Sequence, residues 1–153
     1  MPKHEFIVGR VDKPDITWNK NGILLDGNPV NLYASIDDEL INYISDSLNW
    51  IEAWYPNGSH EKGLALYGYS IIKESENLKK FRDIIISWRN LFIHAPEMIL
   101  LTGDCGWDGE SEKKGYYEKN KFKKIDIIDS MDDLAEVIEK ALISGEYVIH
   151  CGI

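Results

Sequence analysis

Apolar side chains recur at helical spacing in three stretches of the chain. The first stretch begins near Asp37 and ends before Pro56, the second covers about 76–93, and the third runs from Met131 to about Ser144. Residues three and four positions apart line one face of a helix, so each stretch predicts an amphipathic helix with one buried side. The apolar stripes are Leu40, Ile41, Ile44, Leu48 and Ile51; Leu78, Phe81, Ile85, Trp88 and Phe92; and Leu134, Val137, Ile138, Ala141 and Leu142.

Shorter runs of branched and aromatic residues predict about six strands. Asn21-Gly22 supplies the positive φ angles of a tight hairpin turn. The uncharged run 98–102 is typical of a strand at the centre of a sheet. The expected strands are 5–9, a hairpin of 16–18 and 23–25, 64–73, 98–102, a stretch within 116–129, and 146–150, with a short extended piece at 30–33.

Polar signals mark the expected helix ends. Ser35 with Asp38, and Ser130 with Asp133, have the spacing of capping boxes at the starts of the first and third helices. Gly145 is placed to end the third helix in a left-handed conformation.

The order of elements is strands, helix, strand, helix, two strands, helix, strand. This order predicts an α+β or α/β fold, in which a mixed sheet of about five or six strands packs with three helices in a two- or three-layer sandwich. The strands at 64–72, 98–102 and 147–150 would form its centre. No linker rich in Pro, Gly or Ser interrupts the chain, so we expect residues 1–153 to form a single globular domain.

The segment GDCGWDGESEKKG, residues 103–115, is expected to be a loop that follows a buried strand, a common position for functional residues. A nucleophilic Cys105 would need a nearby cation, but Asp104 and Asp108 would raise the pKa of its thiol. The carboxylates of Asp104, Asp108, Glu110 and Glu112 could bind a divalent metal, although their spacing differs from the calcium-loop pattern. A surface loop with an exposed Trp107 that contacts a partner is the third interpretation.

Aromatic residues also gather near the end of the first helix. Trp50 and Trp54 are one turn apart and would share a helix face. Together with Tyr55 they would form either the edge of the core or an aromatic contact patch beside the polar loop 56–63.

Charge is unevenly distributed along the sequence. The chain has 26 acidic and 17 basic side chains and a formal charge of −9, which argues against a nucleic-acid-binding protein. Residues 113–124 contain six lysines and only Glu118 against them; the other residues carry 25 acidic and 11 basic side chains, a charge of −14. The lysines are expected to protect an exposed strand edge, and the acidic remainder indicates either ordinary solubility or a basic protein partner.

Several signals are absent from the sequence. It has no apolar segment typical of a secretion signal and no apolar run of about 20 residues. We therefore expect a cytoplasmic protein in which Cys105 and Cys151 are free thiols. Metal-ligand spacings, phosphate-binding loops and nucleophile elbows are also missing, so no cofactor, metal or catalytic residue is predicted.

The overall pattern resembles the small immunity proteins of bacterial polymorphic-toxin and contact-inhibition systems. The resemblance rests on the acidic α/β character, the aromatic-rich composition, and the segment from Pro96 to Asp104 that leads into a glycine- and acid-rich loop. It implies a stoichiometric inhibitor that covers the active site of a secreted toxin domain, often a nuclease.

The leading hypothesis is therefore a non-enzymatic protein-binding domain, an immunity protein that neutralises a basic toxin domain. Two alternatives stay open: a small hydrolase or transferase that uses the 103–110 loop, with Asp104, Cys105 or Asp108 as acid, base or nucleophile, and a structural or adaptor domain. The expected contacts with the partner protein are Trp54, Tyr55, Asp104, Trp107, Asp108 and Glu110.

Overall fold

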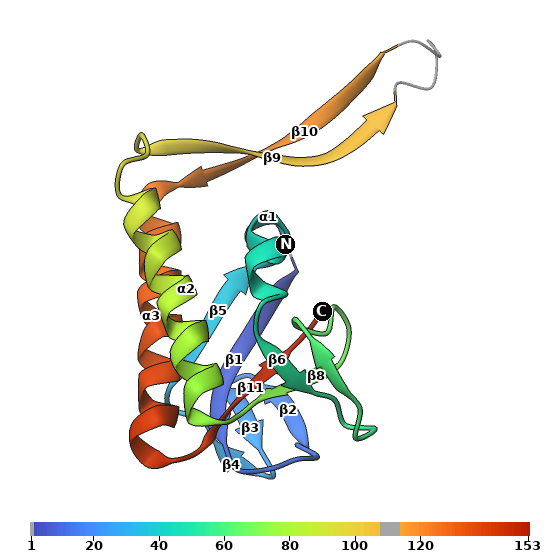
Figure 1. Ribbon diagram of the computed structural model, residues 1–153, viewed down its shortest axis with the longest axis vertical. Coiled ribbons are helices and arrows are strands. Elements are labelled where there is room, and N and C mark those ends of the chain that lie inside the picture. Colours follow the sequence, from blue (N-terminus) through green and yellow to red (C-terminus); the bar gives the residue numbers. More distant parts are fainter. Residues whose placement is uncertain (1, 108–113) are drawn as a thin grey trace.

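The computed structural model describes residues 2–107 and 114–153. Within these residues the chain forms three helices and eleven strands, and six of the strands make the main sheet in the order β5-β1-β11-β8-β6-β7 (Figure 1). These strands are β1 (Lys3–Gly9), β5 (Tyr33–Asp37), β6 (Glu52–Trp54), β7 (His60–Lys62), β8 (Tyr69–Ile72) and β11 (Tyr147–Cys151). The helices are α1 (Asp38–Leu48), α2 (Ser75–Phe92) and α3 (Lys124–Ser144).

The main sheet is buried on both faces, which gives three layers. On one face Phe6 and Val148 join the apolar stripes of the three helices in a single core. On the other face Ile7 and Ile149 pack against a small sheet of β2 (Ile16–Asn19), β3 (Gly22–Leu25) and β4 (Asn28–Pro29). Alternate side chains of a strand point to opposite faces, so β1 and β11 supply both cores. The expected α+β fold is confirmed.

Every neighbouring pair among the described strands of the main sheet is antiparallel, where a mixed sheet was expected. The central pair is β8 and β11, and the helices α2 and α3 lie between them in the sequence. Because α3 runs back along α2, the chain enters β11 at the end of the sheet where it left β8. The two strands therefore run in opposite directions. The prediction that β8 and β11 lie near the centre of the sheet is confirmed.

Residues 98–102 do not join the main sheet, so the prediction of a central strand there was wrong. They begin β9 (Met98–Trp107), which pairs only with β10 (Gly115–Lys123) in a separate two-stranded ribbon. Ile99 and Leu101 are buried, whereas Met98 and Leu100 between them are exposed. The apolar run is thus buried on one side only, against the helices.

Several predicted helix ends were also wrong. Helix α3 begins seven residues before Met131, and α1 ends at Leu48, so Trp54 is not on a helix. No side-chain hydrogen bond caps the start of α1 or of α3. The Ser130 hydroxyl, which was expected to cap α3, donates to the carbonyl of Ile127 inside that helix. The left-handed Gly145 at the end of α3, with φ of 66°, is confirmed.

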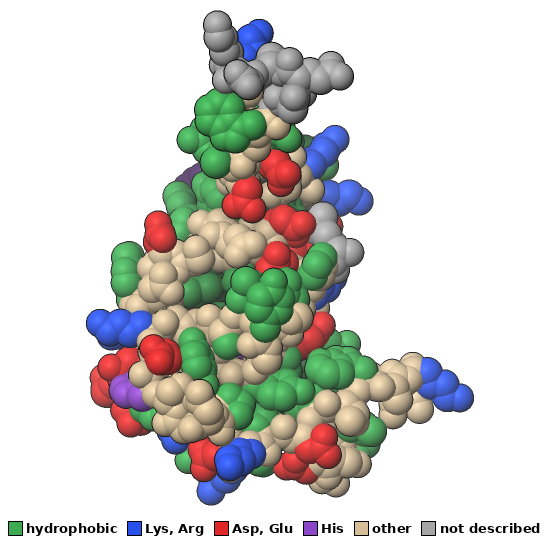
Figure 2. Space-filling model, turned by 90° about the vertical axis from the view of Figure 1, so that its right-hand side faces the viewer, with side chains coloured by type: hydrophobic (Ala, Val, Ile, Leu, Met, Phe, Trp, Pro, Cys, Tyr) green, Lys and Arg blue, Asp and Glu red, His purple; other side chains and the backbone are tan. Residues whose placement is uncertain are grey.

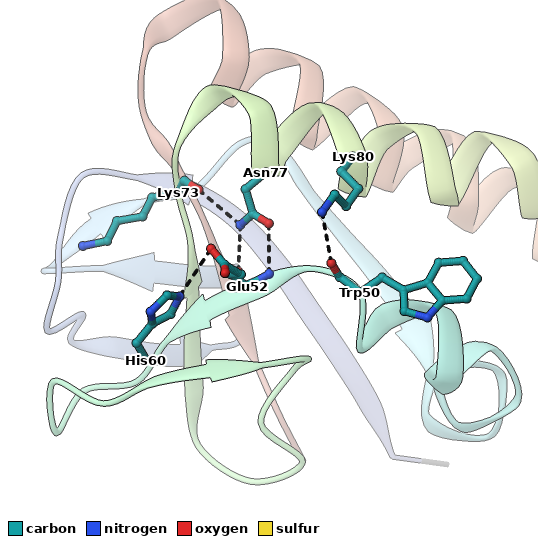
Figure 3. Close-up of polar contacts among 6 residues, drawn as sticks. All are labelled: Trp50, Glu52, His60, Lys73, Asn77 and Lys80. Atoms are coloured by element: carbon teal, nitrogen blue, oxygen red, sulfur yellow. Dashed lines mark hydrogen bonds and ion pairs between the residues drawn. The ribbon is translucent and has the colours of Figure 1, made fainter.

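Asn77 of α2 fastens β6 to the rest of the molecule (Figure 3). Its Oδ1 accepts a hydrogen bond from the Glu52 N–H at 2.9 Å, and its Nδ2 donates to the Glu52 carbonyl at 2.7 Å. Strand β6 pairs with β8 at one position only, Trp54 with Ile71. At the start of β6 the Asn77 amide therefore makes the hydrogen bonds that a neighbouring strand would make.

In the described part of the chain, none of the helices has the length and apolar character needed to cross a lipid bilayer.

Candidate protein-binding surface

The β9–β10 ribbon forms an arm that projects from one end of the molecule (Figure 1). At its base, Ile99 and Leu101 of β9 and Phe122 of β10 are buried in the helical core. Lys124 closes the base, because its backbone N–H donates to the Glu97 carbonyl at 2.8 Å. The base is therefore fixed to the body, and the remainder of the arm extends away from it.

A bulge in β9 determines which side chains share a face of the arm. Thr102 pairs with Lys119 and Cys105 with Tyr117, so β9 has one more residue than β10 between these pairs. The extra residue reverses the alternation of β9. As a result Trp107 and Cys105 lie on the same outer face as Tyr117 and Lys119, away from the buried side of the ribbon.

Aromatic rings cover the glycines of the distal arm. A Cβ atom built on Gly106 would lie 2.6 Å from Cζ of Tyr116, and one built on Gly115 would lie 3.6 Å from the Trp107 ring. Each ring thus packs across the ribbon on a residue without a side chain, on opposite faces of the arm. Trp107 is still 70% exposed and Tyr117 is 65% exposed. The Trp107 ring is thus packed on Gly115 while it presents most of its surface to solvent.

An acidic cleft lies between the arm and α1. The cleft has a volume of about 430 Å³, and four carboxylates face it from three elements. One carboxylate oxygen of Glu39 is buried and has no hydrogen-bond partner among the described residues. Figure 2 shows hydrophobic side chains at the end of the arm and acidic side chains just below them. The cleft is lined by Asp38, Glu39, Asn42, Tyr43, Thr102, Gly103, Asp104, Glu118 and Asn120.

The structure brings together only some of the residues that the sequence singled out. Asp104 and Trp107 belong to the arm, although their segment is strand β9 and not the expected loop. Asp108 and Glu110 lie outside the described residues. Trp54 and the following Tyr55 belong to β6 and its end, in the body of the molecule and far from the end of the arm (Figure 1).

The two aromatic residues of the β6 region are engaged within the body. Trp54 stacks on His60, with ring centroids 4.4 Å apart, and Lys73 Nζ lies 5.0 Å from the Trp54 ring centroid. Tyr55 donates from its hydroxyl to the Gly63 carbonyl at 3.4 Å. His60 also pairs with Glu52 at 3.4 Å, as Figure 3 shows. These contacts favour the core-edge interpretation of Trp54 and Tyr55.

A larger cavity of about 710 Å³ lies where the end of α1 meets α2. Trp50 on its wall is exposed, and Trp88 donates to the Ser47 hydroxyl at 2.8 Å. Two of its three cations have carboxylate partners: Lys79 pairs with Glu76 of the same helix, and Arg82 pairs with a carboxylate of α3. The third, Lys80, donates to the Trp50 carbonyl at 3.4 Å.

The two cysteines lie in different surroundings. Cys105 is exposed on the outer face of the arm, whereas His4, His60 and His150 belong to the main sheet and His94 follows the end of α2. Cys151 is buried, and burial raises the pKa of its thiol to about 12. Among residues 2–107 and 114–153 there is no group of three side chains placed to ligate a metal ion.

A buried chain of polar groups escaped the sequence analysis. His4 Nε2 lies 2.8 Å from Asp38 Oδ1, and His4 Nδ1 lies 2.7 Å from His150 Nε2. His150 Nδ1 lies 3.2 Å from Ser70 Oγ, which accepts from the Ala65 N–H at 2.6 Å. His4 and His150 are 1% and 0% exposed. Because 146 residues separate these histidines, no local pattern could indicate their contact.

Comparison with protein-family models gave no match, and searches of curated proteins and of solved structures gave none either.

Proposed function

We propose that this chain is a non-enzymatic protein-binding domain that neutralises a basic toxin domain, as immunity proteins do, and that its arm is the main contact. The proposal depends on one observation above all: Trp107 and Tyr117 sit at fixed positions on a projecting ribbon and remain largely exposed. Tryptophan and tyrosine are the residues most often found at energetic centres of protein interfaces.

Charge indicates the kind of partner. The cleft beneath the arm has four carboxylates and, among its lining residues, no lysine or arginine. A Lys or Arg side chain of a partner would be attracted into it, and the overall charge of −9 would speed the encounter with a basic protein. Toxin nucleases carry basic active sites because they bind phosphates, so an acidic inhibitor suits them. A binding protein of this kind performs no chemistry, which agrees with the position of Cys105 away from the histidines of the sheet.

The test uses the protein encoded next to this chain, if that open reading frame ends in a toxin domain. Binding is measured by calorimetry and by stopped-flow fluorescence for three proteins: the wild type, Trp107→Ala and Trp18→Ala. Trp18 is a matched control because it is also exposed but lies on β2, in the small sheet. We expect Trp107→Ala to weaken binding by roughly 30-fold or more, and Trp18→Ala to leave it unchanged.

Salt provides the second measurement. The association rate of the wild type should fall as ionic strength rises, because steering by unlike charges is screened. Asp104→Asn with Glu118→Gln should reduce both the rate and its dependence on salt. Equal affinities of the two tryptophan variants, or an association rate that salt does not alter, would contradict the proposal.

A further inference from the structure

The buried chain of Asp38, His4, His150 and Ser70 has one consistent direction of hydrogen bonding. An ionised carboxylate can only accept, so His4 Nε2 carries a proton toward Asp38. With His4 neutral, its Nδ1 must accept, so His150 Nε2 carries the next proton. His150 Nδ1 then accepts from the Ser70 hydroxyl. Both imidazoles are neutral in this arrangement, and every donor has an acceptor.

One additional proton can enter this chain without breaking the contact between the histidines. The proton on His150 Nε2 moves to His4 Nδ1, and a proton from solvent binds His150 Nδ1. His4 becomes an imidazolium beside the Asp38 carboxylate, and His150 becomes the other neutral tautomer. Ser70 Oγ would then accept from both His150 and the Ala65 N–H, and its hydroxyl hydrogen would lose its acceptor.

A second proton does not fit. Two imidazolium rings would direct N–H groups at each other across 2.7 Å, in a site where both rings are almost fully buried. The ring planes are 12° apart with centroids 5.0 Å apart, so the two imidazoles lie edge to edge and their facing nitrogens point directly at each other.

Apolar rings cover the pair on the helix side, whereas Glu5 is a neighbouring carboxylate close enough to interact electrostatically with His4. Phe6 covers His150 on the helix side, at 4.9 Å between ring centroids, and Phe81 of α2 packs against Phe6. Glu5 and Cys151 are sequence neighbours of the pair and point to the opposite face of the sheet, where Glu5 accepts from Ser35. Glu39 lies in the cleft beside Asp38, and the acidic residues of α3 that are exposed to solvent are Asp126, Asp129, Asp132, Asp133, Glu136 and Glu139.

We infer that Asp38, His4, His150 and Ser70 form a one-proton switch that runs across the neighbouring strands β1, β11 and β8 and connects the acidic cleft to the turn that precedes β8. At one end, Asp38 lines the cleft under the arm. At the other end, Ser70 holds Ala65 at the start of a turn that carries the exposed Leu66 and Tyr67. Uptake of one proton changes the charge beside the cleft and weakens the anchor of that turn. The inference concerns the protein without a partner and does not depend on the proposed function.

Nuclear magnetic resonance of the ring nitrogens tests the switch directly. At about pH 8 both His4 and His150 should be neutral with the proton on Nε2. On acidification of the folded protein, His4 should become an imidazolium while His150 changes to the tautomer with the proton on Nδ1, at the same midpoint. Amide hydrogen exchange at Ala65 should become faster over the same pH range.

Two variants of adjacent carboxylates sharpen the test. Asp38→Asn keeps an oxygen acceptor for His4 but removes the charge, so the midpoint should fall by at least about one pH unit, a roughly tenfold weaker affinity for the proton. Asp37→Asn removes the neighbouring charge, which faces Lys3 at 4.0 Å, and should leave the midpoint unchanged.

Three results would overturn the inference: a His150 tautomer that stays constant until the wild type unfolds, two imidazolium rings in the folded wild type, or equal midpoints for the two variants. The ring spectra of the wild type decide the matter alone if Asp38→Asn does not fold.

Discussion

Replacing Asn77 with alanine should lower the free energy of unfolding by about 2.5 kcal/mol. The Asn77 amide is almost fully buried and makes three hydrogen bonds: one from the Glu52 N–H, one to the Glu52 carbonyl, and one to the Lys73 carbonyl at 3.2 Å. Each is worth about 1 kcal/mol net. The better helix propensity of alanine returns about 0.5 kcal/mol.

Urea unfolding followed by circular dichroism measures this difference, with two comparison variants. Asn90→Ala makes the same change at an exposed position of α2 and should be neutral or slightly stabilising. Asn77→Asp keeps the acceptor for the Glu52 N–H but directs a carboxylate at two carbonyl oxygens, so it should destabilise more than Asn77→Ala.

The order of the three variants is the decisive result. If Asn77→Ala lies within about 0.5 kcal/mol of Asn90→Ala, the amide does not hold β6 in place. An Asn77→Asp variant as stable as the wild type would show that the donated bonds to the Glu52 and Lys73 carbonyls contribute nothing.

Three further predictions concern His150, the two cysteines and Gly152. Burial lowers the pKa of His150 well below its usual value, so on acidification the unfolded state binds a proton at His150 and the folded state does not. His150 should therefore leave the free energy of unfolding unchanged above about pH 6.5 and lower it by up to about 1.4 kcal/mol per pH unit below that pH. Urea titrations that show no decrease would contradict this. Under native conditions an excess of a thiol reagent should label one cysteine per chain, the exposed Cys105, and should reach the buried Cys151 only in urea; mass spectrometry that finds both labelled in the folded protein would refute the difference in burial. Gly152→Ala should destabilise by about 1–3 kcal/mol, because its methyl group would overlap the carbonyl oxygen of Leu66; an unchanged melting temperature would show that this turn adjusts freely.

Local periodicity was sufficient to predict most of the elements but not how they associate. The stripes of α1 and α2 and the hairpin of β2 and β3 depend on residues close in sequence, and all are present. Ile125 and Ile127 fit a strand as well as a helix, and this ambiguity concealed the start of α3. The apolar run 98–102 shows that one side is buried, but not whether a sheet or a group of helices buries it.

The candidate surface was predictable to a similar extent. The sequence placed Trp107 and Asp104 in an exposed loop; both lie in strand β9, and Trp107 is exposed as expected. Trp54 was expected on the first helix, but it lies on β6, where stacking on His60 and the position of Lys73 engage it within the body. The contact between His4 and His150 depends on β1 and β11 lying side by side, which is a property of the whole fold.

The place where the arm joins the body has a consequence for how this protein can vary. A backbone hydrogen bond of 2.8 Å joins Glu97 and Lys124, the residues that flank the ribbon. The polypeptide therefore leaves the body and returns to it at neighbouring positions. Beyond Leu101 and Phe122 its described residues take no part in the apolar cores. Substitutions beyond Leu101 and Phe122 should therefore change the surface of the arm while the sheet and helices stay intact.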